Sequence, residues 1–234
     1  MAYDMGVYSD TVRARAARNV LTSATPRLNA ERVVLYPGLG KRLFDLAFVA
    51  VIAVPVVIVL MVLAVLVALD GRSPFYVQKR LGRHGRVFRM YKLRSMVADA
   101  DQVLNAYLDS NPAARAEWDR NQKLRDDPRV TWIGHLIRKT SLDELPQFLN
   151  VLKGDMSVGG PRPMMCEQRD LYPGTEYYEM RPGITGFWQT SVRNESSFEQ
   201  RAEYDRDYFY RLSLLTDLKI VMRTFGVVIR ATGH

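Results

Sequence analysis

One uninterrupted hydrophobic run dominates the pattern of apolar and polar positions along this chain. Its 24 residues, from Leu46 to Leu69, read LAFVAVIAVPVVIVLMVLAVLVAL and include no charge. As a straight helix the run would be roughly 36 Å long, compared with about 30 Å for the hydrocarbon core of a bilayer. This length and uniformity predict a helix that resides in a membrane. A cleaved signal peptide would begin nearer the N-terminus and end at a small-residue cleavage site.

Both flanks of this run are basic. Residues 1–42 carry seven Lys or Arg and three Asp or Glu, and residues 71–98 carry eight Lys or Arg and no acid. Because basic flanks favour the cytoplasmic side of a membrane, a spanning helix would place one of them on the disfavoured side. Pro55 lies within the run and can kink or break a helix. We therefore predict a re-entrant membrane helix over residues 41–70, broken at Pro55, with a spanning helix and a buried soluble helix as alternatives.

Shorter apolar and polar stretches alternate after the run. The stretch GRSPFYVQKRLGRHGRVFRMYKLRSM predicts short strands around a turn at residues 82–86. A charged helical insert follows at about residues 97–128 and is broken at Asn111-Pro112. The glycine- and proline-containing stretches SVGGPRP (157–163) and RPGITGFWQ (181–189) predict loops.

The C-terminal stretch LSLLTDLKIVMRTFGVVIRATGH combines an apolar face with charges. It is therefore expected either to lie along a membrane surface or to pack on a core. The whole pattern predicts a mostly helical, membrane-associated chain with a few short strands. Its parts are a basic N-terminal segment (1–40), the membrane helix (41–70) and a cytosolic domain (71–234).

Two adjacent carboxylates, Asp143 and Glu144, lie in the stretch TSLDELPQ. Their ordinary interpretation is the start of a helix, either with Ser141 and Glu144 as a capping box or with Asp143 as the N-cap. The second register is easier to accommodate because it moves Pro146 into the first helical turn. Carboxylates at this place also suit chemistry, since they can bind Mg²⁺ and an aspartate can attack phosphorus directly.

Basic residues recur close to these carboxylates and in stiff loops. The chain has a net charge of +8, which favours an anionic partner. Proline on both sides of Arg162 restricts the direction of its guanidinium. Arginine suits bidentate recognition of phosphate. The candidate phosphate- or nucleotide-binding residues are Lys92, Arg94, Arg138, Arg162 and Arg181.

Other chemistries find little support in the sequence. The three histidines, His84, His135 and His234, have no metal-ligand spacing, and Cys166 is the single cysteine, which excludes an intrachain disulfide. There is no G-x-S-x-G motif, no G-x-G-x-x-G motif and no Walker loop. Carboxylates among basic residues predict instead a site for phosphates and a divalent cation.

Several motifs occur in an order that resembles the bacterial sugar transferase family, the monotopic phosphoglycosyl transferases. They are KRLFD, FRMYKLRSM, RKTSLDELPQFLNVLKGDMSVGGPRP, RPGITGFWQTSVRN and DLKI, within about residues 40–226. The resemblance implies transfer of a sugar-1-phosphate from a UDP-sugar to undecaprenyl phosphate, with release of UMP. It also implies a mostly helical α/β fold with a re-entrant membrane helix, interfacial amphipathic helices and a small cytosolic catalytic core. That core would lie on the cytoplasmic face of the bacterial inner membrane.

The resemblance assigns roles to residues of this chain. Asp143 would be the nucleophile that forms a covalent phosphosugar intermediate and a ligand of Mg²⁺, and Glu144 would orient it or assist with protons and metal. Arg162 would hold a phosphate, and Asp205 in EYDRDYF matches an acidic position of less defined role. The insert is similar to that of the branch that starts exopolysaccharides, capsules or O-antigens, which favours UDP-galactose or UDP-glucose as the donor.

Two other classes are compatible with parts of the sequence. A membrane-anchored basic protein would bind acidic lipids or nucleic acid without catalysis, but it has no reason to place carboxylates among its arginines. A phosphatase acting on a polyprenyl diphosphate would share the nucleophile. The partners that the resemblance implies are a UDP-sugar, undecaprenyl phosphate and inner-membrane lipids, with no nucleic acid and with self-association into a homo-oligomer left open.

Overall fold

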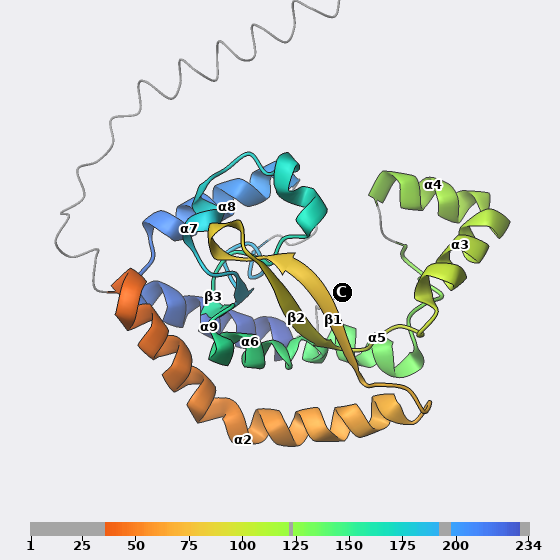
Figure 1. Cartoon of the computed structure of the whole chain (residues 1–234), viewed down its shortest axis with the longest axis horizontal. Coiled ribbons are helices and arrows are strands. Elements are labelled where there is room, and N and C mark those ends of the chain that lie inside the picture. Colours follow the sequence, from red (N-terminus) through yellow and green to blue (C-terminus); the bar gives the residue numbers. More distant parts are fainter. Residues whose placement is uncertain (1–35, 122–123, 192–197, 230–234) are drawn as a thin grey trace, which may run out of the picture. The chain divides into compact units, whose positions relative to one another are not determined.

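Helices dominate the part of the chain that the computed structural model describes, residues 36–121, 124–191 and 198–229 (Figure 1). The helices and helical turns are η1 (Tyr36–Gly40), α2 (Lys41–Ala68), η2 (Arg83–Gly85), α3 (Ala100–Ser110), α4 (Pro112–Asn121), α5 (Trp132–Lys139), η3 (Leu142–Glu144), α6 (Gln147–Lys153), η4 (Cys166–Leu171), α7 (Glu176–Glu179), α8 (Phe198–Tyr210) and α9 (Leu214–Ile229). The strands are β1 (Phe75–Leu81), β2 (Val87–Leu93), β3 (Ser157–Gly159) and β4 (Gly183–Thr185). The predicted mostly helical α/β fold is confirmed, while the predicted basic segment over 1–40 lies outside the described residues except for its last five.

The strands β1 and β2 form the antiparallel hairpin that the sequence predicts, with η2 at its turn. His84 takes a left-handed backbone conformation there, with φ of 57°. The register pairs Tyr76 with Lys92 and Arg80 with Phe88, and directly opposed residues share one face of a sheet. Because side chains alternate between faces along a strand, the hairpin brings Arg80 and Lys92 to the same side.

Two short parallel strands, β3 and β4, lie where the sequence predicts loops. Their backbones approach so closely that a Cβ atom on Gly183 would lie 2.2 Å from the backbone nitrogen of Gly160. Glycine is needed at this position because any side chain would displace the neighbouring backbone. The loop predictions over 157–163 and 181–189 are therefore incomplete, since each stretch contains a strand. The pairing fixes the segment that carries Arg162.

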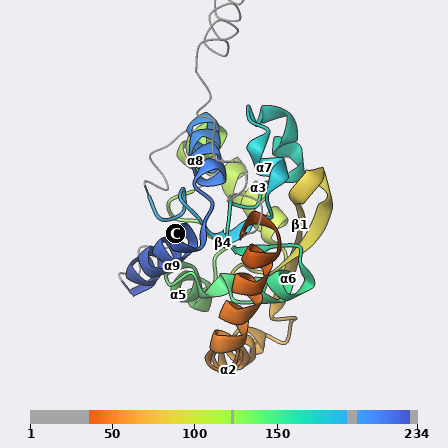
Figure 2. The same cartoon turned by 90° about the vertical axis from the view of Figure 1, so that its left-hand side faces the viewer.

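The helix α2 is one continuous element of 28 residues that includes Pro55 near its midpoint. It bends in its middle, so that its two halves run in different directions (Figure 1). Figure 2 shows the same bend from the side. Proline removes an amide donor and crowds the preceding turn, which accounts for the bend. The break predicted at Pro55 is therefore a bend within an unbroken helix, and re-entry into a membrane stays a prediction.

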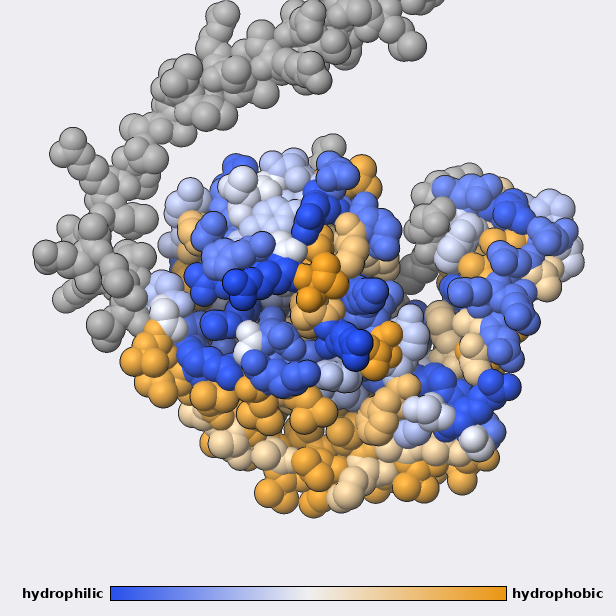
Figure 3. Space-filling model, in the orientation of Figure 1, coloured by the Kyte–Doolittle hydropathy of each residue, from blue (hydrophilic) through white to orange (hydrophobic). Residues whose placement is uncertain are grey.

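Much of the surface of α2 is apolar and exposed. The segment Tyr36–Ala68 is long and apolar enough to cross a membrane, by length and composition. Exposed apolar residues also lie on α5, α6 and α9, for example Trp132, Leu149 and Phe225. Figure 3 shows hydrophobic residues gathered along one edge of the described part, over α2. Apolar surface of this extent is typical of proteins that bind membranes.

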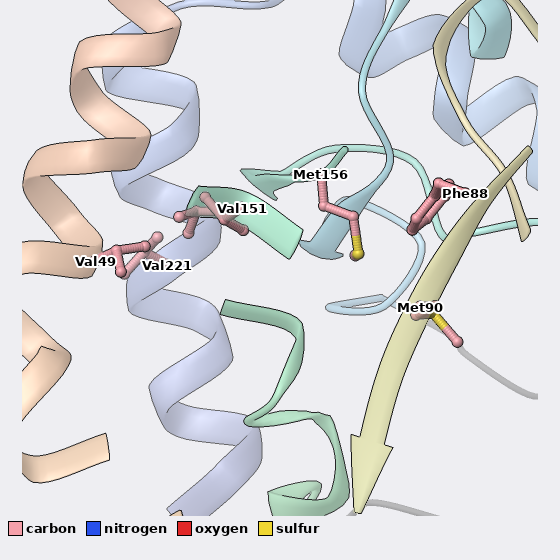
Figure 4. Packing of buried hydrophobic residues seen from close by; sticks show 7 residues of the cluster. Val49, Phe88, Met90, Val151, Met156 and Val221 are labelled. Carbon is pink, nitrogen blue, oxygen red and sulfur yellow. The ribbon is translucent and has the colours of Figure 1, made fainter. Parts of the chain in front are cut away.

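The main core lies where α2, β2, α6, β3 and α9 meet. Its buried residues are Val49, Phe88, Met90, Val151, Met156, Val158 and Val221. Figure 4 shows Val49 of α2, Val151 of α6 and Val221 of α9 within this cluster. The first half of α2 is therefore part of the folded core and is not a separate anchor.

The C-terminal stretch, expected either to pack on a core or to lie along a membrane surface, forms the helix α9. Its residues Asp217, Ile220 and Val221 are buried, whereas Leu218 and Met222 are exposed. The expected packing on a core is thus confirmed for one face. The other face has the apolar character expected of a helix at a membrane surface.

A buried network of charges fixes the start of α2. Lys41 Nζ lies 2.8 Å from Asp217 Oδ2 and 3.3 Å from Asp45 Oδ1, and the three side chains are at most 7% exposed. The hydroxyl of Tyr208 donates to Asp217 Oδ1 at 2.6 Å, and that of Tyr36 donates to Oδ2 at 2.5 Å. Residues of the motifs KRLFD and DLKI therefore join α2 to α9. Lys41, Asp45 and Asp217 are termed the closed cluster below.

The predicted charged insert forms the helices α3 and α4. The side-chain oxygen of Asn111 accepts a hydrogen bond from the Ala114 amide at 3.1 Å and so begins α4. The two helices pack around a small apolar cluster of their own that includes Leu108. The break predicted at Asn111-Pro112 is confirmed, and the insert contributes no lining to the cavities described next.

Candidate active site

The two adjacent carboxylates lie on a single 3₁₀ turn, η3, between α5 and α6. Ser141 precedes this turn in a left-handed conformation with φ of 58°, and its side chain makes no capping hydrogen bond. The helix α6 begins only after Pro146. Both capping interpretations of Asp143 and Glu144 are therefore wrong, because neither carboxylate caps a helix. A non-glycine residue in the left-handed region is strained, and such residues concentrate at functional sites.

Lys92, on β2, connects the two carboxylates. Its Nζ lies 3.4 Å from Asp143 Oδ2 and 3.4 Å from Glu144 Oε1. The side chains of Lys92, Asp143 and Glu144 are 19%, 14% and 23% exposed. The structure thus brings three predicted site residues together, and it leaves all three within reach of a ligand. They are termed the open cluster below.

The charge of this cluster is only partly compensated. Burial raises the pKa of Asp143 above its usual range, and the negative charge of Glu144 adds to the rise. The positive charges of Lys92 and Arg138 oppose it. A carboxylate that is short of solvation and close to a like charge favours a bound cation or an electrophilic partner.

A main cavity of about 450 Å³ opens at the carboxylates. Its charged lining consists of Lys92, Arg138, Asp143, Glu144 and Arg162. Much of its apolar lining comes from α2 and α9, namely Phe48, Ile52, Pro55, Val56, Val221 and Phe225. The proline at the middle of α2 therefore borders the same cavity as the carboxylates. This combination suits a ligand that has an anionic head and an apolar tail.

Arg162 is held in the loop after β3 by its neighbours. Its guanidinium lies 5.5 Å from the ring centre of Trp188. The guanidinium of Arg201 donates to the carbonyl oxygen of Arg162. Arg201 Nε in turn lies 3.9 Å from Asp205 Oδ2, which also accepts from the hydroxyl of Tyr172 at 2.9 Å. This chain of contacts fixes where Arg162 meets the cavity.

Asp205 lies behind the site and lines neither described cavity. It is 2% exposed, and burial raises its pKa to about 6 against the opposing effects of Arg201 and Tyr172. The sequence singles out Asp205 as an acidic site residue without a defined role. Its contacts make it a positioning residue that acts on Arg162 through Arg201.

The other predicted arginines separate into two groups. Arg138 lines the main cavity from the last turn of α5. Arg94 instead binds both oxygens of Asp70 at 2.7 Å, just after the end of α2. Arg181 donates from Nε to the carbonyl oxygen of Gly154 at 2.9 Å, at the end of α6. Neither Arg94 nor Arg181 lines a described cavity, and the phosphate contact predicted for each stays a prediction.

Sequence reasoning missed two residues that complete the lining. Arg80 lines a second, smaller cavity together with Lys92, Glu144 and Arg162, and Gln189 lines both cavities. In the sequence, Arg80 contributes only to the basic flank of the membrane run. Counting outward from the predicted turn would have placed it on the hairpin face of Lys92. Gln189 offers no such signal, because its loop reaches the site only through the pairing of β3 with β4.

The residues of the open cluster fit a Mg²⁺ ion that is shared with a ligand's phosphates. Within residues 36–121, 124–191 and 198–229, no group of three or more His, Cys, Asp or Glu side chains could hold a metal by itself. Mg²⁺ is commonly bound by one or two carboxylates together with phosphate oxygens and water. Asp143 and Glu144 supply that number of carboxylates in the main cavity.

Fold and site together define a class: an α/β protein with one helix that is long and apolar enough to cross a membrane, and with two carboxylates beside a cavity that also has an apolar lining. Comparison with protein families gives the particular member of that class. The family described as bacterial sugar transferase matches residues 36–231. The chain therefore belongs to the bacterial sugar transferase family.

Three relatives illustrate the similarity. The chain is 47% identical over 195 residues to the UDP-galactose-lipid carrier transferase of Erwinia amylovora and 44% identical over 195 residues to the undecaprenyl-phosphate galactose phosphotransferase of Salmonella typhimurium. Each match covers 82% of this chain and 41% of the relative. It is 44% identical over 200 residues to the exopolysaccharide production protein ExoY of Sinorhizobium fredii, covering 84% of this chain and 88% of that protein. The chain thus spans about two fifths of the first two relatives and most of the third.

Proposed function

We propose that this chain transfers a hexose-1-phosphate from a UDP-sugar to undecaprenyl phosphate and releases UMP, as the first membrane step of exopolysaccharide, capsule or O-antigen synthesis. UDP-galactose and UDP-glucose are the favoured donors. The observation that carries the proposal is the main cavity, where the open cluster meets an apolar lining from α2 and α9. The names of two relatives, which refer to galactose, a lipid carrier and undecaprenyl phosphate, support it.

In the first step, Asp143 attacks the phosphorus that carries the sugar. A bond forms between a carboxylate oxygen and that phosphorus, and the bond from phosphorus to the bridging oxygen breaks, so that its electron pair leaves on UMP. Lys92 and Arg162 offset the negative charge of the reacting phosphates from the same cavity. Glu144 shares Lys92 with Asp143 and so keeps the lysine beside the nucleophile. A Mg²⁺ ion held by Asp143 and Glu144 would supply further neutralisation of the diphosphate.

In the second step, an oxygen of undecaprenyl phosphate attacks the same phosphorus. The bond from phosphorus to Asp143 breaks, which restores the carboxylate and leaves the sugar on a lipid diphosphate. The acceptor enters along the apolar lining, because its hydrocarbon chain is more stable against Phe48, Ile52 and Phe225 than in water.

In this scheme α2 is re-entrant in the cytoplasmic leaflet of the bacterial inner membrane, and the catalytic residues face the cytoplasm. Ion pairs at both of its ends support this topology, since Lys41 binds Asp217 at the start and Arg94 binds Asp70 just after the end. A helix with both ends attached to one domain has both ends on one side of the membrane. Cysteines introduced at Gly38 and Gly71, with Cys166 replaced by Ser, are expected to react only with a thiol reagent that reaches the cytoplasm. Labelling of one site from the outside would indicate a spanning helix.

The reaction is tested by measuring UMP release from detergent-purified protein with Mg²⁺, undecaprenyl phosphate and either UDP-galactose or UDP-glucose. We expect release that depends on the lipid with one of these sugars, and none with Asp143→Asn. Asp170→Asn, at an exposed position, is the matched control and should keep the wild-type rate. Without lipid, mass spectrometry should find a hexose phosphate on the peptide that contains Asp143.

Each alternative has its own signature in this assay. Lipid-independent release of UMP, or hydrolysis of a polyprenyl diphosphate, would point to a phosphatase. Absence of turnover with a broad panel of UDP-sugars would leave a membrane-anchored protein that binds anions without catalysis. Full activity of Asp143→Asn would remove the covalent intermediate from the mechanism.

A further inference from the structure

A second cavity, of about 20 Å³, adjoins the main cavity on the side of Glu144. The two cavities share Lys92, Glu144 and Arg162 in their linings, and the second adds Arg80 and Gln147. None of the residues that line the second cavity belongs to α2 or α9. A ligand group in it would therefore meet several polar and charged side chains without touching the apolar side chains of α2 and α9.

Arg80 and Arg162 bring two positive charges together in the second cavity, which Glu144 also lines. Among the described residues, neither forms an ion pair with Asp or Glu. Burial lowers the pKa of Arg80, and with the nearby charges of Arg162 and Arg201 it brings this pKa to about 10. Half-buried like charges raise the free energy of the folded protein unless an anion compensates them. Within the part of the chain that the structure describes, a bound anion would therefore stabilise this pair of guanidinium groups.

The guanidinium of Arg80 is held in place and still has a donor to offer. Its Nη2 donates to Gln78 Oε1 at 2.7 Å, and its Nη1 donates to the carbonyl oxygen of Pro163 at 3.4 Å. Its Nε is buried and has no hydrogen-bond partner in the part of the chain that the structure describes. A side chain fixed by two contacts loses little freedom when it binds a ligand, which favours a preformed site.

We propose that Arg80 and Arg162 bind the nucleotide-side phosphate of the donor, the group that leaves as UMP. This inference rests on the proposed function. In that reaction, the bond breaks between the sugar-bearing phosphorus and the oxygen that bridges the two phosphates of the donor. The electron pair of that bond passes to the UMP oxygen, so negative charge grows on the phosphate beside Arg80. The lipid phosphate and the nucleotide phosphate then approach the carboxylates from differently lined cavities, which keeps the two substrates apart.

The test compares three variants of the full chain in detergent: Arg80→Met, Arg80→Lys and Arg89→Met. Arg89 is exposed on the opposite face of the same hairpin, so its variant is the matched control. We expect Arg80→Met to raise the inhibition constant of free UMP and the KM for the UDP-sugar roughly 10- to 100-fold, because charged hydrogen bonds are lost. The KM for undecaprenyl phosphate should stay within about twofold. Arg80→Lys should recover part of the loss, and Arg89→Met should behave as wild type.

Three results would overturn the proposal. A rise in the KM for undecaprenyl phosphate, with the nucleotide constants unchanged, would assign the second cavity to the lipid phosphate. Unchanged constants for both substrates would show that Arg80 has a structural role only. If Arg80→Met and Arg89→Met weaken UMP and UDP-sugar binding equally, the effect comes from the overall positive charge of the hairpin and not from a site at Arg80.

A binding measurement keeps this inference separate from the proposed reaction. UMP, but not uridine, should raise the melting temperature of the wild type and of Arg89→Met, and it should not raise that of Arg80→Met. If Arg80→Met does not fold, Arg80→Lys must still show a smaller UMP effect than the wild type. If the wild type binds UMP through Arg80 and yet releases none from any UDP-sugar, the proposed reaction is wrong and the anion site stands.

Discussion

The closed and the open cluster have the same composition, one lysine between two carboxylates, and opposite surroundings. In the closed cluster, Lys41 lies 2.8 Å and 3.3 Å from its partners, and the three side chains are at most 7% exposed. In the open cluster, Lys92 lies 3.4 Å from each partner, and the side chains are 14–23% exposed. Two tyrosine hydroxyls donate to Asp217 in the first cluster, whereas a cavity of about 450 Å³ adjoins the second.

This difference separates charges that hold the fold from charges that are available to a ligand. A buried lysine with close carboxylates and tyrosine donors has its hydrogen bonds made within the protein, so removing one member leaves an unpaired buried charge. Longer contacts beside a cavity can be exchanged for contacts to phosphate at little cost. One lysine with two carboxylates therefore anchors α2 in one place and is open to a ligand in the other.

The largest effect is expected from Asp143→Asn. Loss of a nucleophile commonly costs roughly 10⁴- to 10⁶-fold in turnover. UMP release in the presence of undecaprenyl phosphate measures it. Because burial raises the pKa of Asp143, its ionised form is destabilised in the folded protein, and the neutral Asn should leave the melting temperature at pH 7 equal or higher. A clear drop in melting temperature would place Asp143 with the residues that hold the fold.

Lys41→Met tests whether the closed cluster stabilises the fold without taking part in the reaction. It leaves two buried carboxylates without a cation, which should cost about 3–5 kcal/mol of folding stability. For a chain of this size we expect a melting temperature lower by roughly 10 °C, measured in detergent by thermal unfolding. The turnover of the fraction that remains folded should change little.

Lys92→Met is the matched change in the open cluster. It should lower turnover strongly and leave the melting temperature within a few degrees of the wild type. If Lys41→Met and Lys92→Met prove equally destabilising, the distinction between the two clusters does not hold.

Asp205 is expected to make the folding stability depend on pH, with an effect of intermediate size. Its pKa is about 6 in the folded protein, compared with an ordinary value of 3.8, so the folded protein takes up this proton more readily than the unfolded chain. Protonated Asp205 therefore adds about 3 kcal/mol to the free energy of unfolding. This contribution is fully present below about pH 4 and is lost as the pH rises through 6. The melting temperature of Asp205→Asn relative to wild type should therefore rise between pH 4 and 6 and level off above 7. A difference that does not vary with pH would contradict this.

The smallest effect is expected from Arg94→Met. Arg94 joins the end of β2 to Asp70, and the exposure of Asp70 to solvent weakens the contribution of this pair. We expect a melting temperature only slightly lower than that of the wild type and a KM for the UDP-sugar within about twofold. A large rise in that KM would restore the predicted role of Arg94 in phosphate binding.

Local sequence patterns predicted the features that depend on neighbouring residues. The hairpin turn, the helix break at Asn111-Pro112 and the long apolar helix with Pro55 all follow from short stretches. The pair Asp143 and Glu144 was also found this way, although the capping alternative could not be dismissed. Only the structure shows that α6 begins after Pro146, so that the two carboxylates are not caps.

The sequence alone therefore determined which charges, turns and apolar segments the chain contains, and with them the membrane helix and the candidate carboxylates. The tertiary structure decided which charges have partners. It paired Lys41 with Asp217, attached Arg94 to Asp70 and placed Arg80 beside Arg162, neither of them in an ion pair with another described residue. The physical reason is that burial and pairing arise from contacts between residues far apart in the chain, and a charge acquires its pKa and its role from those contacts.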